Sequence, residues 1–382
     1  MSGACSIPLT RQSDCAAIEC SYADTAEKAL ASRVVIFAAC AKISVLQGCS
    51  GGMTEDGPDQ LDQESAGTAM AWIPGGTFLM GSDRHYPEEK PCHSVKVAGF
   101  WMDQTAVTNR AFTRFVAATG HKTVAERPLD PALYPGAPPD MLAPGALVFR
   151  MTAGPVDTRD IRNWWHWTKG AHWRAPEGPG SDITSREDHP VVHVAFEDAA
   201  AYAAWAGKEL PTEAEWECAA RGGLDGAEFA WGEELAPGGV YLANTWQGPF
   251  PWRNFETDGF TGTCPVKSFP PNGYGLFEVC GNVWEWTVDW WGAKHAADAE
   301  SPCCVAENPR GADMAGSFDP LQPAIRIPRK VVKGGSFLCA PSYCRRYRPA
   351  ARHAQMVDTG MSHIGFRCIR RPSSQSSRGT LT

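Results

Sequence analysis

Two cysteines five positions apart, Cys339 and Cys344, form the part of the sequence best suited to chemistry. Pro341 and Ser342 lie between them and favour a turn, so the two thiols can converge on one point. A pair of this kind has three common uses. It forms a disulfide, it supplies half of a zinc site, or it holds a soft metal without further protein ligands.

Metal preference separates these uses only in part. Zinc prefers four ligands, and the nearest further candidates, His353 and Cys368, lack a recognisable paired spacing. Cu(I) is satisfied by few soft thiolates, so two cysteines suffice and one coordination position stays open. Three nearby arginines would lower the thiol pKa values: Arg345, Arg346 and Arg348. From spacing alone, a disulfide or a pair of idle thiols is the more common use, and all three uses stay open.

A second segment places Glu278 and Glu285 on either side of Gly281. Glycines let backbone carbonyls turn inward, and carbonyl and carboxylate oxygens are the ligands that Ca²⁺ prefers. The spacing is not that of an EF-hand loop. An aromatic-rich core hairpin with two solvated glutamates is locally the more common structure.

A third segment combines Asn244, Thr245 and Gly248 with the later Asp258-Gly259-Phe260. Amide and carboxylate oxygens beside turn-forming glycines suit a hard cation. The alternative is a pair of turns whose side chains cap their own backbone.

The composition describes the frame that must position these groups. The chain has 382 residues, a net charge of -8 and no basic block, which argues against a nucleic-acid partner. A hydrophobic content of 43% is enough for a sizeable core. The 38 Gly and 30 Pro predict many turns and ordered loops, and the 15 Trp supply the large apolar anchors that such loops need.

Regular elements are expected mainly before residue 222. The segment 71–81 predicts a strand, a tight turn and a second strand. Two helices are expected over 105–119 and 197–206, each ended by a glycine. A third helix is expected to start at Thr212, because Thr212 and Glu215 have the spacing of a capping box.

The ends of the chain differ from its centre. Residues 1–68 are expected to be a disordered extension, or a stretch upstream of the true start, and residues 373–382 a disordered tail. Val34–Leu46, followed by Cys49, faintly resembles a lipoprotein signal, but Lys42 interrupts its apolar part. No run reaches the ~18 apolar residues needed to span a bilayer. The 14 Cys have irregular spacing and predict reduced thiols in a cytoplasm, with an exported lipoprotein as the alternative.

Taken together, these segments resemble the formylglycine-generating enzymes, also called sulfatase-modifying factors, from Trp72 to about Arg371. The wider superfamily shares the entry motif and the Gly-Asn-Val-Trp-Glu-Trp segment without the activity, whereas the Cys-x4-Cys loop separates the true oxidases. The shared motifs are Ile73-Pro74-Gly75-Gly76, Trp173-Arg174, Pro176-Glu177-Gly178-Pro179, His189-Pro190-Val191-Val192-His193-Val194, Leu210-Pro211-Thr212-Glu213-Ala214-Glu215-Trp216, Ala243-Asn244, Trp246-Gln247-Gly248, Gly281-Asn282-Val283-Trp284-Glu285-Trp286 and Gly365-Phe366-Arg367-Cys368.

The resemblance implies a compact α+β fold in a single catalytic domain, residues 69–372, with little regular secondary structure and a relation to C-type lectin domains. It also implies two structural Ca²⁺ sites. Glu278 replaces an Asn of animal relatives and is still a hard oxygen ligand. The first site comprises Asn244, the Thr245 carbonyl, Asp258 and the Phe260 carbonyl, and the second Glu278, the Gly281 and Val283 carbonyls, and Glu285.

The resemblance further implies a mechanism. Cys339 and Cys344 hold Cu(I) as thiolates, and the substrate cysteine adds as a third thiolate. O₂ reacts at copper, a hydrogen leaves the substrate Cβ, and the thioaldehyde hydrolyses to formylglycine. Ser336 and Tyr343, beside the copper ligands, are expected to position oxygen or water.

The implied substrate is an unfolded segment of a sulfatase-type polypeptide with a Cys-x-Pro-x-Arg motif, bound by a monomeric enzyme. An extended peptide that contains proline loses little entropy when it lies in a groove. Candidates for the substrate cleft are Trp173, Arg174, Trp284, Arg352 and His363.

The sequence departs from the family pattern at several positions. Cys368 matches a cysteine that is disulfide-bonded in secreted animal forms, but its partner position is Ala203. A second animal disulfide maps onto Ala220 and Pro349, which agrees with a reducing compartment. Two cleft positions also differ: Ala340 stands where His is frequent, and His363 where the family has Asn.

Two other functions share this superfamily. A non-catalytic, lectin-like member would bind a ligand or a protein, but such members usually lack the cysteine pair. A sulfoxide synthase would use non-haem iron bound by a His-rich motif in an additional helical domain. Residues 1–68 contain no His, which argues against the second function.

Overall fold

The computed structural model describes residues 69–295 and 305–372 of the chain. The expected extension and tail, including Val34–Leu46, lie outside the described residues. Among the helices that are described, none is both long enough and apolar enough to cross a bilayer. The helices are α1 (Asn109–Thr119), α2 (Pro139–Leu142), α3 (Phe196–Trp205) and α4 (Glu213–Arg221).

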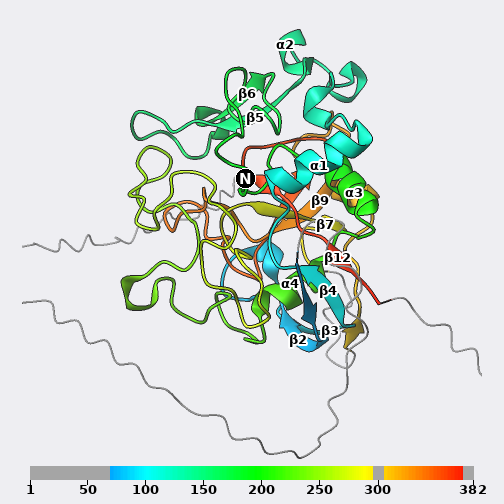
Figure 1. Cartoon of the computed structure of the whole chain (residues 1–382), viewed down its shortest axis with the longest axis vertical. Coiled ribbons are helices and arrows are strands. Elements are labelled where there is room, and N and C mark those ends of the chain that lie inside the picture. Colours follow the sequence, from blue (N-terminus) through cyan, green and yellow to red (C-terminus); the bar gives the residue numbers. More distant parts are fainter. Residues whose placement is uncertain (1–68, 296–304, 373–382) are drawn as a thin grey trace, which may run out of the picture. The chain divides into compact units, whose positions relative to one another are not determined.

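The strands form several small sheets (Figure 1). One sheet has the order β10-β9-β7-β11, two others have the orders β1-β4-β12 and β2-β3-β8, and β5 pairs with β6. The strands are β1 (Met70–Ile73), β2 (Gly76–Met80), β3 (His93–Val97), β4 (Phe100–Asp103), β5 (Gly145–Phe149), β6 (Trp165–Lys169), β7 (Trp284–Trp290), β8 (Ala306–Glu307), β9 (Arg329–Lys333), β10 (Arg352–Met356), β11 (Ile364–Gly365) and β12 (Ile369–Arg370).

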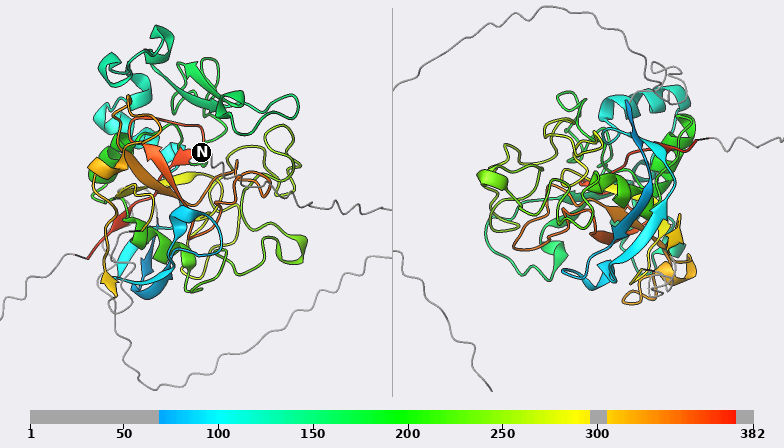
Figure 2. Two further views of the ribbon diagram at one scale, coloured as in Figure 1. Left: turned by 180° about the vertical axis from the view of Figure 1, so that it is seen from behind. Right: turned by 90° about the horizontal axis from the view of Figure 1, so that it is seen from below.

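Helix α4 joins two of these sheets. It contacts β7 and β9 of the four-stranded sheet and also β2 and β3 of the second sheet. Helices α1 and α3 contact each other and lie on another side of β7 and β9 in Figure 1. Seen from below in Figure 2, the loop-rich region coloured green to yellow lies to one side of the blue strands. The mixture of helices and mainly antiparallel sheets confirms the expected α+β class.

Helix ends follow the expected capping chemistry. The Thr212 side chain accepts a hydrogen bond from Glu215 N at 3.1 Å, and Glu215 Oε2 accepts one from Thr212 N at 2.7 Å, so the capping box is confirmed. Helix α1 ends at Gly120 with a φ of 69°, also as expected. It begins later than expected, because the cap is Thr108, whose own backbone is extended with a φ of −85° and a ψ of 161°.

The predicted strand, turn and strand over 71–81 are present, but the two strands do not pair with each other. β1 pairs with β4 and β2 pairs with β3, each in antiparallel register. The turn at Gly75 therefore moves the chain from one sheet to another. An added Cβ at Gly75 would lie 2.6 Å from the Val97 carbonyl oxygen, so glycine is required at this close approach.

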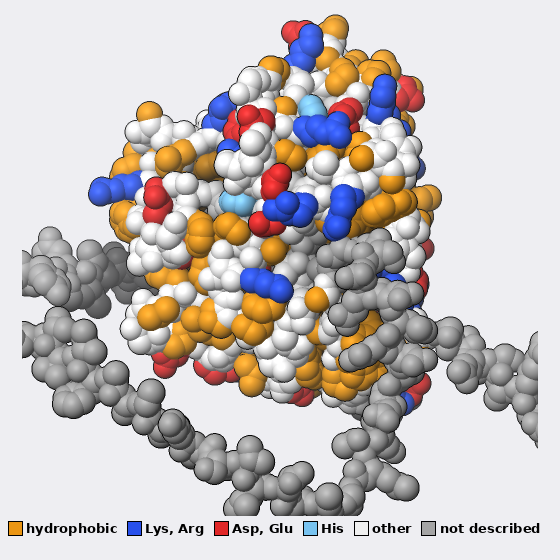
Figure 3. Space-filling view, in the orientation of Figure 1, with side chains coloured by type: hydrophobic (Ala, Val, Ile, Leu, Met, Phe, Trp, Pro, Cys, Tyr) orange, Lys and Arg blue, Asp and Glu red, His pale blue; other side chains and the backbone are white. Residues whose placement is uncertain are grey.

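Tryptophan anchors the loops, as the composition predicts. Five Trp side chains are at most 1% exposed, and they occur in loops as well as in strands and helices. On the face shown in Figure 3, acidic and basic side chains are interspersed among hydrophobic ones. The five are Trp164, Trp173, Trp216, Trp246 and Trp286.

Candidate active site and cation sites

The two cysteines converge because the chain turns back on itself after β9. Gly335 has a φ of 71°, and an added Cβ would lie 2.7 Å from the Arg346 carbonyl oxygen. The turn closes where Cys344 N donates to the Ala340 carbonyl at 2.8 Å. Glycine and this single turn therefore bring the start and the end of the loop together.

The Sγ atoms of Cys339 and Cys344 lie 3.3 Å apart. This is well beyond the ~2.05 Å of a disulfide bond, and all cysteines among the described residues are free thiols. Cys339 is 2% exposed, whereas Cys344 is only partly buried. Cys339 therefore belongs to the interior, and Cys344 is the partly exposed member of the pair.

The two thiols differ in acidity. The hydrogen bond from Cys339 and the neighbouring charge of Arg346 lower the pKa of Cys344 to about 6, against the effect of burial. Burial raises the pKa of Cys339. Ser336 N donates to Cys339 Sγ at 3.4 Å, and Arg346 Nη1 lies 3.8 Å from Cys344 Sγ. Without a metal, the geometry supports one thiolate that is stabilised by its thiol neighbour.

The donor set fits a soft metal that needs few ligands. Within residues 69–295 and 305–372, no three or more His, Cys, Asp or Glu side chains are arranged to hold an ion. The four ligands of a closed zinc site are therefore not supplied there. Two converging sulfurs, one of them accessible, suit Cu(I) with a position left for a further thiolate.

The two residues expected to assist the cysteines differ in their exposure. Tyr343 is 39% exposed, stacks on Phe250 at 4.5 Å and meets Trp164 edge-on at 5.5 Å. Ser336 is fully buried, and its hydroxyl accepts a hydrogen bond from Leu338 N at 3.3 Å. Tyr343 thus belongs to an aromatic wall at the surface, whereas Ser336 supports the loop from inside.

Of the five cleft candidates, only Arg174 and His363 reach solvent. Trp173 and Trp284 are buried in the main hydrophobic core. Arg352 is also buried, and its guanidinium pairs with the carboxylate of Glu213 through two hydrogen bonds of 2.7 and 2.8 Å. These three side chains therefore stabilise the interior and do not offer a surface to a peptide.

The three arginines after Cys344 have separate partners. Arg346 alone lies against a cysteine sulfur. Arg345 pairs with Glu228 at 3.1 Å, and Arg348 pairs with Glu89. The expectation that all three act on the thiols is correct for one of them. Sequence reasoning also missed Glu88, which pairs with Arg346 at 2.6 Å, because nothing near Glu88 in the sequence indicates a partner so distant.

The structure brings together the four groups expected to form the first calcium site. The Asp258 carboxylate accepts hydrogen bonds from Thr245 N at 2.9 Å and Phe260 N at 3.1 Å. Asn244 Oδ1 is buried without a hydrogen-bond partner among the described residues. Burial raises the pKa of Asp258. Asn244 immediately precedes Thr245, whose amide binds the partly buried Asp258 carboxylate, so an unpartnered buried oxygen in this region fits a hard cation.

The Gln247 amide lies inside this first set. Its Nε2 donates to Asp258 Oδ2 at 2.8 Å and to the Thr245 carbonyl. A bound cation would require this amide to rotate, which would exchange a nitrogen donor for an oxygen ligand. The set of residues therefore suits an ion, and Gln247 is a further ligand candidate that the sequence did not single out.

The second expected calcium site does not fit an ion. Glu285 accepts hydrogen bonds from Arg367 at 2.7 and 2.8 Å and from Trp216 Nε1 at 2.7 Å. Glu278 instead accepts from the backbone amides of Lys267 and Phe269. Arg367 thus supplies the positive charge where Ca²⁺ was expected, and Glu278 and Glu285 do not converge on a shared cation.

Gly281 and Val283 lie on the short connection between these two glutamates. Gly281 has a φ of 78°, and an added Cβ would lie 2.3 Å from the Asn244 carbonyl oxygen. This segment therefore packs closely against the first set. Its glycine is explained by that contact, without a carbonyl turned toward an ion.

The fold and the paired thiols define an α+β domain that presents two neighbouring free thiols in one loop. Residues 57–372 match the family described as Sulfatase-modifying factor enzyme 1-like domain, and the chain belongs to this family. The boundary expected at residue 69 is later than the start of this match and stays a prediction.

Three relatives show the range of this family. The chain is 54% identical to the "Formylglycine-generating enzyme" of Mycobacterium tuberculosis, over 80% of this chain and 99% of the relative. It is 48% identical to the protein of the same name from Thermomonospora curvata, over 83% and 98%. The "Inactive C-alpha-formylglycine-generating enzyme 2" of Mus musculus is 37% identical, over 78% and 85%.

Proposed function

We propose that this chain is a formylglycine-generating enzyme that uses Cu(I), bound by Cys339 and Cys344, and O₂. Its substrate would be the cysteine of a Cys-x-Pro-x-Arg segment in a sulfatase-type polypeptide. The observation that carries the proposal is the pair of free thiols 3.3 Å apart, with one sulfur buried and the other accessible. Two relatives named for this activity match this chain over almost their full length.

The net reaction defines what the site must do. Two electrons and two protons leave the Cβ–S unit of the substrate cysteine and pass to O₂, which gives a thioaldehyde and hydrogen peroxide. Water then replaces sulfur, and the aldehyde and hydrogen sulfide are the products. Cu(I), when bound, would supply a soft centre that accepts the substrate thiolate and allows electron transfer to O₂.

The protein groups around the sulfurs have separate tasks. Cys339 is fixed in the interior by the turn and by Ser336 N, while Cys344 is partly exposed. Arg346 lies against Cys344 and balances negative charge as thiolates gather. Tyr343, on the exposed aromatic wall, is the group that an incoming peptide would meet beside the cysteines.

The competing function is that of a non-catalytic member that binds a ligand or protein. A relative whose name describes it as inactive is 37% identical, so family membership does not by itself establish turnover. The cysteine pair favours the enzyme, because a binding module has no need of two converging thiols.

The proposed compartment is a bacterial cytoplasm, where the thiols would stay reduced. Cys368 is buried in the same hydrophobic cluster as Ala203, which occupies the family's partner position. No cysteine is therefore available at that place to oxidise with it.

A direct test uses a synthetic Cys-x-Pro-x-Arg peptide and copper-loaded protein, with the product followed by mass spectrometry. Formation of the aldehyde, and its absence with a Ser-x-Pro-x-Arg peptide, would support the proposal. Tight Cu(I) binding without conversion of the cysteine peptide would instead favour the binding module.

A further inference from the structure

The segment Tyr86–Glu89 contacts the end of the cysteine loop, although it lies more than 250 residues earlier in the chain. Arg345 N donates to the Tyr86 hydroxyl at 3.0 Å. The Arg346 guanidinium lies 3.9 Å above the centre of the Tyr86 ring and 2.6 Å from Glu88 Oε1. One side chain of the loop is thus held by an aromatic face and a carboxylate together.

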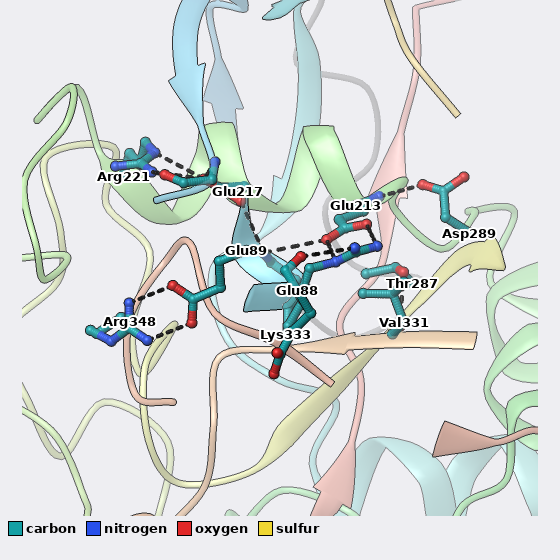
Figure 4. Close-up of polar contacts among 12 residues, drawn as sticks. Glu88, Glu89, Glu213, Glu217, Arg221, Thr287, Asp289, Val331, Lys333 and Arg348 are labelled. Carbon is teal, nitrogen blue, oxygen red and sulfur yellow. Dashed lines mark hydrogen bonds and ion pairs between the residues drawn. The ribbon is translucent and has the colours of Figure 1, made fainter. Parts of the chain in front are cut away.

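Buried ion pairs fix this segment in place. Glu89 binds Arg348 through two hydrogen bonds of 2.8 and 2.5 Å, and both side chains are at most 1% exposed. The Glu88 carbonyl accepts from Arg352 Nη1 at 3.2 Å, and Arg352 is held in turn by Glu213 of α4. Figure 4 shows Glu89 turned toward Arg348, with the Glu213, Glu217 and Lys333 group beside it.

The fixed segment determines where the Arg346 charge lies. The side chains of Arg346 and Glu88 are 20% and 17% exposed, so solvent does not separate them. A planar guanidinium that stacks on a ring and pairs with a carboxylate has little freedom left. Its third contact is Cys344 Sγ at 3.8 Å, on the partly exposed cysteine of the pair.

We propose that Glu88 and Tyr86 are positioning residues that hold the Arg346 guanidinium against the sulfur of Cys344. Through Arg346 they set how firmly the thiol pair holds Cu(I) and how readily a substrate thiolate joins it. The inference rests on the proposed function. A dithiolate around a singly charged metal is anionic, and a further thiolate is repelled unless a cation lies close by.

Glu88 could act on Cu(I) binding in two ways, by its own negative charge or by holding Arg346 in place, and the two ways have opposite effects. If the Glu88 carboxylate merely offset the positive charge of Arg346 at the sulfurs, its removal would tighten Cu(I) binding and lower KM. If it holds Arg346 in place, its removal weakens Cu(I) binding and raises KM. The sign of the change in Glu88→Gln therefore separates the two roles.

The experiment compares Glu88→Gln, Arg346→Gln and the double variant in the full chain. Cu(I) affinity is measured by anaerobic competition with a chromophoric Cu(I) chelator, and KM and kcat are measured with the cysteine peptide. Arg346→Gln should weaken Cu(I) binding at least about tenfold, as expected for loss of a charge at this distance. Glu88→Gln should weaken Cu(I) binding about threefold or more. It should also raise KM by a larger factor than it lowers kcat.

Two comparisons test whether Glu88 acts through Arg346. In the Arg346→Gln background, Glu88→Gln should have no further effect on Cu(I) affinity. Glu228→Gln is the matched control, because Glu228 has the same 17% exposure and pairs with the guanidinium of Arg345, which, unlike that of Arg346, has no hydrogen bond to a cysteine sulfur in the described structure. This control should bind Cu(I) as wild type does.

Three results would overturn the inference: unchanged affinity in Glu88→Gln, tighter binding in Glu88→Gln, or an undiminished Glu88→Gln effect in the double variant. Should Glu88→Gln prove insoluble, Tyr86→Leu removes the stacking face and must change affinity in the same direction. Wild-type protein that binds Cu(I) but converts no peptide would reject the proposed function alone, since the affinity pattern is measured without turnover. Wild-type protein that binds no Cu(I) would reject both.

Discussion

Glu285 and Arg367 form a fully buried pair, joined by two hydrogen bonds of 2.7 and 2.8 Å. The same guanidinium donates to the Phe277 carbonyl at 2.8 Å and to the Asp103 carbonyl at 3.3 Å. The pair therefore connects β7 to the closing segment of the chain and to β4. It occupies the place where the family resemblance implies a cation.

Glu285→Gln should lower the free energy of unfolding by about 3–5 kcal/mol, because Arg367 would remain buried without a compensating charge. The effect should be the same with and without a calcium chelator, as measured by urea unfolding. Elemental analysis that finds two calcium ions in wild type and one in the variant would instead restore Glu285 as a calcium ligand.

Asp258→Asn should remove the stabilisation by calcium at the first site. An ion that binds only the folded state contributes about 2.7 kcal/mol at a concentration 100 times its Kd. Calcium should therefore raise the Tm of wild type but not that of the variant. Asp188→Asn, in an exposed pair with Arg110, is the control and should keep the calcium response. A wild-type Tm that ignores both calcium and chelator would contradict this prediction.

Cys339→Ser and Cys344→Ser should each abolish aldehyde formation and weaken Cu(I) binding, because a single thiolate cannot replace the pair. Their melting curves should stay close to wild type, which separates loss of the metal from loss of the fold. Cys218→Ala is the control for general thiol effects. Burial raises the pKa of Cys218 to about 12, and the residue lies in a separate hydrophobic cluster. Wild-type turnover in either serine variant would reject the two-thiolate mechanism.

The group around Glu217 predicts how stability depends on pH. Burial alone would raise the pKa of Glu217, but Lys333 and Arg221 outweigh it and hold the pKa at about 2, below its ordinary value of 4.5. A lowered folded-state pKa contributes stability that is complete above 4.5 and is lost as the pH falls toward 2. The contribution is on the order of 3 kcal/mol.

Glu217→Gln should therefore be less stable than wild type at neutral pH, and the difference should shrink as the pH falls from 4.5 to 2. Chemical unfolding at a series of pH values measures this difference. Glu209→Gln, in an exposed pair with Arg371, should follow the wild-type profile. A constant difference between Glu217→Gln and wild type across this range would contradict the lowered pKa.

A truncated protein of residues 69–372 should fold and retain the activity of the full chain. The first strand begins at Met70, and the last strand ends at Arg370. Soluble expression and turnover of the cysteine peptide check this boundary. Loss of soluble protein would show that the domain needs residues before 69. The family match starts at residue 57, so residues 57–68 would be the first to restore.

Local chemistry made part of this structure predictable. The capping-box residues Thr212 and Glu215 are three positions apart, and Cys339 and Cys344 are five positions apart, so both have signals within a short window. The first cation set was implied only by family resemblance. Asn244 and Asp258 are separated by an irregular loop, so no local pattern joins them.

The contacts that sequence reasoning missed join distant parts of the chain. The pairing of β1 with β4 depends on tertiary context, since alternating hydrophobicity says which residues form a strand but not its partner. Arg367 lies 82 residues from Glu285, and Arg346 lies 258 from Glu88. No local pattern marks such pairs, so a carboxylate bound by arginine could not be distinguished from one bound by calcium.

The distance along the chain between Glu89 and Arg348, 259 residues, has a consequence for biosynthesis. This pair can form only after both residues have been synthesised, so the Tyr86–Glu89 segment cannot support the cysteine loop before then. In the order of synthesis, Cys339 and Cys344 follow the Tyr86–Glu89 segment that supports their loop. The two thiols therefore gain their complete support only once Arg348 has been added to the chain and has met Glu89.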